Sequence, residues 1–131
     1  MRYLIDTHVF LWFVGNSKEL SRAAKNLLEN PSNDILISIA SLWEISIKTA
    51  LGKLKIAGTY ESVWDDLTDN SIRILPVSFA HTVAQNKLPL LHRDPFDRII
   101  VSQAITEGID LISADETFDD YLKTESVNRI W

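Results

Sequence analysis

The chain has 131 residues, of which 46% are hydrophobic and 24% are charged. This length and composition predict a single globular domain spanning residues 1–131 and argue against a disordered chain. It contains no cysteine, which excludes disulfides and thiolate metal sites. The net charge of −5 argues against a protein that coats DNA, but it is compatible with an acidic site that binds divalent cations.

The predicted elements alternate between strands and helices. In chain order they are a strand at 3–5, helices at 9–14 and 21–29, a strand at 34–38, helices at 39–51 and 61–70, a strand at 72–75, helices at 79–86 and 95–107, a strand at 110–113, a helix at 116–122 and a short strand at 127–130. This order indicates βαβ units. We therefore predict an α/β fold, a three-layer αβα sandwich with a central, mainly parallel sheet of four or five strands.

The N-terminal region contains an apolar run at residues 9–14, preceded by Arg2 and flanked by Asp6 and His8. The run is too short and too close to charged residues for a secretory signal, and a membrane span needs about 20 apolar residues. We therefore expect a cytoplasmic protein.

Acidic residues follow the predicted strands in several places. Asp6 comes directly after the first strand, Glu44 lies in the first turns of the helix after the second, and Asp115 follows the fourth. The helix that contains Asp97 leads into the fourth strand and runs antiparallel to it, so its first turn, with Asp94 just before it, lies at the same edge of the sheet. Open α/β sheets bind ligands at this edge.

Each acid also has a purely structural interpretation. Asp6, Asp94 and Asp115 occupy positions that suit a helix N-cap, and Ser41 with Glu44 fits a capping box. Taken together, however, four or five carboxylates at one edge repel each other and require a counter-charge.

The nearby cations in the sequence are Lys48, Arg93 and Arg98. A bound Mg²⁺ or Mn²⁺ is the simpler counter-charge, because hard cations take oxygen ligands. Such a site, with one or two ions, favours hydrolysis of a phosphodiester by metal-activated water. Three histidines without HxH or HxxxH spacing argue against a zinc site.

Four blocks of sequence resemble the PIN-domain family and, within it, the VapC-type toxins of toxin–antitoxin pairs. The blocks are Tyr3-Leu4-Ile5-Asp6-Thr7-His8, Ser41-Leu42-Trp43-Glu44-Ile45 with Ile47-Lys48, His92-Arg93-Asp94-Pro95-Phe96-Asp97-Arg98 continuing to Ser102-Gln103-Ala104, and Leu111-Ile112-Ser113-Ala114-Asp115 with Phe118. Their order and spacing cover almost the whole chain.

The resemblance implies a PIN-like fold and a Mg²⁺- or Mn²⁺-dependent endoribonuclease that hydrolyses RNA. It places the catalytic, metal-binding acids at Asp6, Glu44, Asp97 and Asp115. Asp94 is the alternative for the third position. We prefer Asp97, because the family pattern places the third acid three residues before an aliphatic helix core, as Asp97 stands before Ile100. The same resemblance implies a homodimer that is neutralised by a small antitoxin.

Several further residues have two interpretations. The resemblance assigns auxiliary positions to Asp94, Thr7 and Ser113, and Lys48 can meet a phosphate or form an i,i+4 ion pair with Glu44. The basic residues that could line an RNA groove, but are more often solvated charges, are Lys53, Lys55, Arg93 and Arg98. His8 is assigned to packing. The aromatic residues assigned to the core or to an interface are Trp12, Phe13, Trp43 and Trp64.

Two other functions share some features of this sequence. An inactive PIN-like module that binds RNA or protein is the main alternative, although such a module does not need mutually repelling acids. A phosphoryl-transfer fold with a nucleophilic aspartate fits poorly, because His8 stands where phosphatases have a second aspartate and the third strand ends in Leu75-Pro76.

Overall fold

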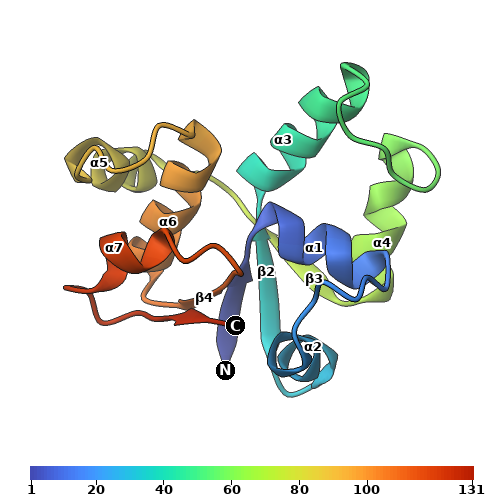
Figure 1. Ribbon diagram of the computed structural model, residues 1–131, viewed down its shortest axis with the longest axis horizontal. Helices are drawn as coiled ribbons and strands as arrows, with labels where there is room; N and C mark the ends of the chain where they lie inside the picture. The colour runs from blue at the N-terminus through green and yellow to red at the C-terminus, as the bar shows by residue number, and fades with distance from the viewer.

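A computed structural model describes all residues 1–131 (Figure 1). Its strands are β1 (Arg2–Ile5), β2 (Asp34–Ser38), β3 (Ile72–Leu75), β4 (Asp110–Ile112) and β5 (Arg129–Ile130). Its helices are α1 (Thr7–Val14), α2 (Arg22–Glu29), α3 (Ile39–Ala50), the short 3₁₀ helix η1 (Tyr60–Ser62), α4 (Val63–Asp69), α5 (Phe79–Lys87), α6 (Pro95–Glu107) and α7 (Phe118–Leu122).

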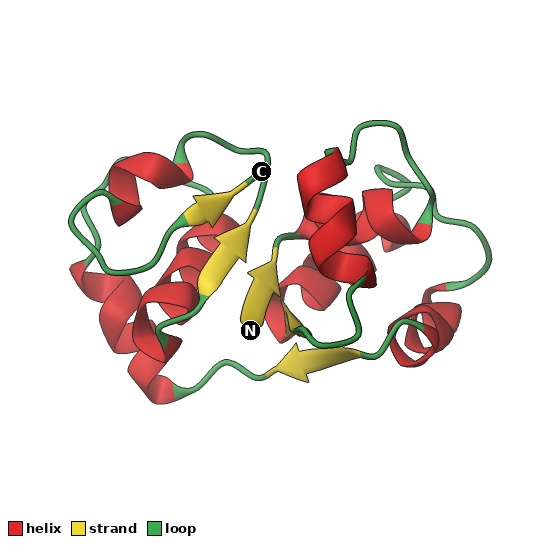
Figure 2. Ribbon diagram, turned by 90° about the horizontal axis from the view of Figure 1, so that it is seen from below, coloured by secondary structure: helices red, strands yellow, loops and turns green.

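The five strands form one sheet in the order β3-β2-β1-β4-β5, and every neighbouring pair is parallel. Helices cover both faces of this sheet, and Figure 2 shows the strands running between two groups of helices. The predicted three-layer αβα sandwich is therefore confirmed.

Alternate side chains of each strand enter two separate cores. Tyr3 and Ile5 of β1 pack with residues of α1, α2, α3 and α4, whereas Leu4 packs with residues of α6 and α7 on the other face. Both faces are therefore apolar, which explains why the strands read as continuous hydrophobic runs rather than as alternating patterns.

The order in which strands are added to the sheet reverses at β1. It first adds β2 and β3 on one side of β1, and later adds β4 and β5 on the other side. Helix α1, which follows β1, and helix α7, which follows β4, pack on opposite faces. A crevice at the carboxyl ends of β1 and β4 is the expected result of this topology, and it is where such sheets bind ligands.

Some predicted boundaries differ from the structure. Helix α1 begins at Thr7 rather than at Val9, because the side chain of Asp6 accepts a hydrogen bond from the Val9 N–H and caps the helix. The helix predicted at 61–70 is divided into η1 and α4, and the last strand contains only Arg129 and Ile130. None of the helices combines the length and the apolar composition that crossing a membrane requires.

Candidate metal centre

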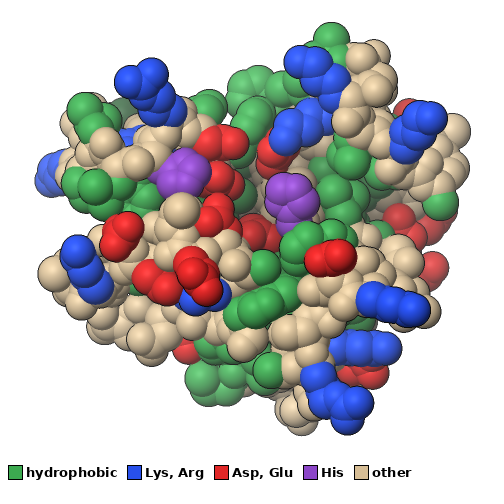
Figure 3. All heavy atoms as spheres, in the orientation of Figure 1, with side chains coloured by type: hydrophobic (Ala, Val, Ile, Leu, Met, Phe, Trp, Pro, Cys, Tyr) green, Lys and Arg blue, Asp and Glu red, His purple; other side chains and the backbone are tan.

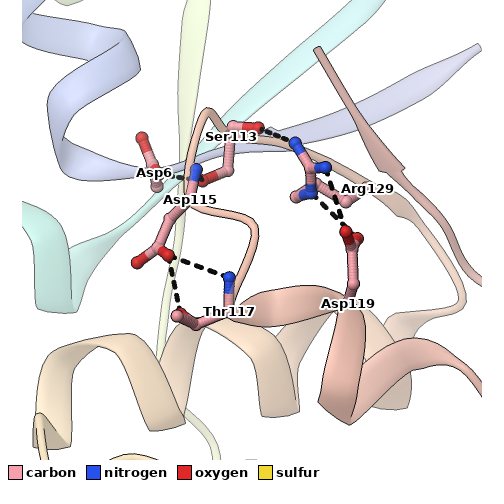
Figure 4. A network of polar contacts seen from close by, with 6 residues as sticks. All are labelled: Asp6, Ser113, Asp115, Thr117, Asp119 and Arg129. Carbon is pink, nitrogen blue, oxygen red and sulfur yellow. Dashed lines mark hydrogen bonds and ion pairs between the residues drawn. The ribbon is translucent and has the colours of Figure 1, made fainter.

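Ser113 joins the two acids that follow β1 and β4 (Figure 4). Its hydroxyl donates to Oδ2 of the buried Asp6 and accepts the backbone N–H of Asp115 at 3.0 Å. The remaining Asp6 oxygen, Oδ1, accepts from Val9 N–H at 2.9 Å as the cap of α1. One serine therefore fixes the spacing between the acids of two neighbouring strands.

The loop after β4 is held from outside by Arg129, also drawn in Figure 4. Its guanidinium donates to the carbonyl oxygen of Ser113 at 3.0 Å and to both carboxylate oxygens of Asp119 at 2.8 and 3.0 Å. Within the loop, Oδ1 of Asp115 accepts from the backbone N–H and the hydroxyl of Thr117. These contacts set the direction of the Asp115 carboxylate.

Glu44 reaches the same edge from the second turn of α3. Its buried carboxylate accepts from the hydroxyl of Thr7 at 2.7 Å through Oε1 and from Nζ of Lys48 at 2.6 Å through Oε2. The structure thus contains the i,i+4 ion pair that was one of two interpretations of Lys48. Thr7 links α1 to α3, because its hydroxyl orients an acid 37 positions away in sequence.

The alternative, purely structural interpretation of Ser41 and Glu44 as a capping box is wrong. Helix α3 is capped by Ser38, whose hydroxyl accepts from Ala40 N–H at 3.0 Å. Ser41 therefore lies inside the helix, and its buried hydroxyl has no hydrogen-bond partner. Glu44 is released from any capping role and points its carboxylate toward the site.

Asp94 and Asp97 have different roles at the start of α6. Asp94 is the N-cap, and its Oδ1 accepts from the backbone N–H groups of Phe96 and Asp97 at 2.8 and 3.2 Å. Asp97 lies in the first turn and takes no part in capping. The geometry therefore favours Asp97 over Asp94 as the free acid of this segment.

The acids repel one another across the site. Burial, followed by the negative charges of Asp94, Asp115, Glu44 and Asp6, raises the pKa of Asp97 to about 7. Burial also raises the pKa of Asp6, although hydrogen bonds from Ser113 and Val9 oppose the increase. Burial is the main cause of both shifts, and repulsion between the carboxylates adds to it.

His92 is a residue of the site that sequence reasoning missed. One nitrogen of its imidazole lies within 4.8 Å of a carboxylate oxygen of Asp97 and of one of Asp115. Its Nε2 also lies 2.8 Å from the hydroxyl oxygen of Thr117. The only sequence signal was its position two residues before Asp94, because no metal-binding spacing involves it.

In the comparison with protein-family models, residues 3–123 match the PIN domain. The chain belongs to the PIN-domain family. Comparison with curated protein sequences gives no match at a significant level.

Solved structures similar to this PIN domain include toxin–antitoxin complexes. VapBC2 from Rickettsia felis, bound to a DNA fragment from its promoter, superposes with a TM-score of 0.69 at 19% identity, covering 99% of this chain and 98% of the other. VapBC-1 from nontypeable Haemophilus influenzae superposes with a TM-score of 0.68 at 17% identity, covering 99% of this chain and 97% of the other. VapBC-5 from Mycobacterium tuberculosis superposes with a TM-score of 0.64 at 18% identity, covering 98% of this chain and 97% of the other. At these identities, the likeness shows the fold.

The PIN fold brings all the predicted acids together. The end of β1, helix α3, the start of α6 and the loop after β4 converge at one edge of the sheet, where Figure 3 shows acidic side chains gathered between two histidines. The contributing acids are Asp6, Glu44, Asp94, Asp97 and Asp115. Oxygen donors of this kind suit a hard divalent cation.

Several residues assigned elsewhere by the sequence occupy different environments. Arg98 is buried rather than lining a groove, and its guanidinium donates to the carbonyl oxygens of Pro89 at 2.9 Å and Gln85 at 3.1 Å. Trp43 and Trp64 are 63% and 62% exposed and do not belong to the core. These corrections follow from helix packing, which hydrophobic periodicity does not define.

Proposed function

We propose that this PIN domain is a metal-dependent endoribonuclease and the toxin of a toxin–antitoxin pair. The observation that carries the proposal is the convergence of Asp6, Glu44, Asp97 and Asp115 at the topological switch point of the sheet. Membership of the PIN-domain family supports nuclease chemistry. The acids are proposed as the metal ligands and catalytic residues, and the ion as Mg²⁺ or Mn²⁺, one or two per site.

The side chains of the site prepare it for phosphodiester hydrolysis. When bound, the ion supplies Lewis acidity and activates water. Ser113 and Thr7 hold the carboxylates of Asp6 and Glu44 in fixed orientations, and Lys48 neutralises part of the charge on Glu44. The N-termini of α1 and α6 face the same edge and favour an anionic substrate through their dipoles.

The proposed partners are an RNA substrate, a small antitoxin and a second copy of the chain. The antitoxin assignment is supported by the VapBC complexes among the similar structures. Exposed aromatic side chains such as Trp43 and Phe79 provide apolar surface for protein contacts. Light scattering coupled to size-exclusion chromatography tests the dimer, and a monomer at micromolar concentration contradicts it.

The test of the enzymatic function is cleavage of a mixed RNA pool by protein freed of any bound inhibitor. We expect the wild type to cut RNA with Mg²⁺ or Mn²⁺ and to be inactive in EDTA. Asp6→Asn and Asp97→Asn should each reduce the rate by at least about 100-fold, because each removes a charged oxygen ligand that positions the ion. Cleavage products are resolved by gel electrophoresis and sequencing.

Asp94→Asn is the matched control for Asp97→Asn, because Asn also caps helices well. We expect it to keep most of the activity. Loss of cleavage in Asp94→Asn with full activity in Asp97→Asn would reverse the assignment of the third acid. If well-folded wild type cuts no RNA with either metal, the chain is instead a binding module, and RNA binding by the inactive protein is then the measurement to make.

A further inference from the structure

His92 extends the acidic site with a nitrogen donor. Its imidazole lies beside Asp97 and Asp115, with one nitrogen and one oxygen of each acid all within 4.8 Å of one another. All three side chains are half-buried. Atoms this close together from three side chains can be bridged by a single cation with modest side-chain movement.

The hydrogen bonds around His92 determine where its proton lies. The Thr117 hydroxyl has one proton, and the carboxylate of Asp115, 2.6 Å away, can only accept it. Thr117 must therefore accept from Nε2–H of His92, which lies 2.8 Å away. This leaves Nδ1 as the nitrogen whose lone pair is available to a cation, as in histidines that bind a metal with one nitrogen while donating with the other.

The backbone that carries His92 is anchored by a buried side chain. The segment at 88–94 connects α5 to α6, and Arg98 of α6 donates from inside the fold to the carbonyl of Pro89 at 2.9 Å. The same guanidinium lies 3.5 Å from the carbonyl oxygen of His92 and 3.3 Å from the hydroxyl of Tyr121. His92 is thus held beside the acids rather than placed at the tip of a free loop.

We propose that His92 is a ligand of the metal held by Asp97 and Asp115, and that the resulting mixed nitrogen–oxygen site binds Mn²⁺ in preference to Mg²⁺. This inference rests on the proposed metal-dependent function. Its physical basis is comparative: Mn²⁺, a transition metal, accepts an imidazole nitrogen more readily than Mg²⁺, which is bound through oxygen ligands. The acids alone provide oxygen donors and therefore a weaker discrimination between the two ions.

His8 is the matched control within the same chain. It lies two residues after Asp6 and close enough for its charge to lower the pKa of that acid. Its side chain is exposed, and its ring packs against Trp12 with centroids 5.7 Å apart. It does not belong to the group of donors formed by His92, Asp97 and Asp115.

The test is electron spin-echo envelope modulation of the full-length protein loaded with Mn²⁺, which detects the ¹⁴N nucleus of a coordinated imidazole. We expect the nitrogen modulation in the wild type and in His8→Asn, and its loss in His92→Asn. Isothermal titration should show that His92→Asn lowers Mn²⁺ affinity by at least about tenfold, with a much smaller change for Mg²⁺. Circular dichroism establishes that both variants are folded.

The possible results separate the two proposals. Tight Mn²⁺ binding without nitrogen modulation in the wild type overturns the role of His92 and leaves the acidic metal site standing. The same holds if His92→Asn retains the modulation or loses Mn²⁺ and Mg²⁺ affinity equally. If the wild type binds neither ion, the metal-dependent function fails together with this inference.

Discussion

Asp97 is the residue whose charge depends most on its neighbours. With a pKa of about 7, its carboxyl is close to half protonated at neutral pH when no cation is bound. The ordinary value is 3.8, so between these limits the folded protein holds a proton that the unfolded chain has released. The excess bound proton links folding to pH at a single side chain.

The sign of this linkage determines how the stability of the protein depends on pH. Because the folded state binds more protons, the free energy of unfolding in EDTA should fall as pH rises from about 4 to about 7 and then level off. We expect the Asp97 contribution to be about 1–2 kcal/mol, since solvent around a partly exposed carboxylate screens the repulsion. Urea unfolding of the wild type and Asp97→Asn between pH 5 and 8 measures it.

The free energy of unfolding of Asp97→Asn should depend less on pH than that of the wild type. The variant should also be the more stable of the two proteins at pH 8. Glu19→Gln, at an exposed position before α2, is the control and should keep the wild-type slope. Parallel curves for wild type and Asp97→Asn would mean that the repulsion is not concentrated on this side chain.

The segment between α5 and α6 shows how one element positions another. Arg98 is 5% exposed, and its guanidinium is surrounded by carbonyl oxygens of this segment and of the last turn of α5, and by the hydroxyl of Tyr121. A buried cation is stabilised only by complete hydrogen bonding. The planar fork of arginine can satisfy several carbonyl groups at once, which the ammonium group of lysine cannot do in the same geometry.

We therefore expect Arg98→Met to lower the free energy of unfolding by about 2–4 kcal/mol, because it leaves buried carbonyl groups without donors. Arg98→Lys should recover only part of this loss. Hydrogen exchange measured by mass spectrometry should show faster exchange at 85–93 in both variants. The exposed Arg93→Met is the control, with a change within about 0.5 kcal/mol. Unchanged exchange in Arg98→Met would exclude the anchoring role.

In the folded molecule the acids lie close together at one edge of the sheet, and their negative charges repel one another. Asp6 and Asp115 follow neighbouring parallel strands, while Glu44 and Asp97 arrive on helices from opposite faces of the sheet. The two hydrophobic cores hold these elements in place against the repulsion between carboxylates. A cation that binds only the folded state should therefore stabilise the entire domain.

Addition of Mn²⁺ to metal-free protein should raise the unfolding temperature. At a free concentration 100 times the dissociation constant, the stabilisation is about 2.7 kcal/mol, which corresponds to about 10 °C for a domain of this size. The double variant Asp6→Asn/Asp97→Asn should show almost none of this increase. Differential scanning calorimetry is the measurement, and an equal increase in both proteins would indicate ion binding elsewhere.

The sequence alone was sufficient for the order of elements and for the edge of the sheet where the acids lie. Strand and helix periods are local properties, so the parallel sheet followed from alternation. Asp6 directly follows β1, Asp115 lies three residues after the end of β4, and Asp97 lies in the first turn of the helix that leads back into β4. These acids share an edge because parallel strands all end there and the helix before β4 begins there. The order of strands and helices in the sequence is sufficient to show this.

The contacts that shape the site depended on tertiary structure. The hydroxyl of Ser113 meets Asp6 across 107 positions of sequence, and His92 reaches Thr117 across 25. The burial of Arg98 likewise depends on how α5 and α7 pack around α6. Such contacts have no local period and no fixed spacing, because they arise only when separate elements pack. The tertiary structure therefore decided which side chains orient the acids, and it revealed the imidazole beside them.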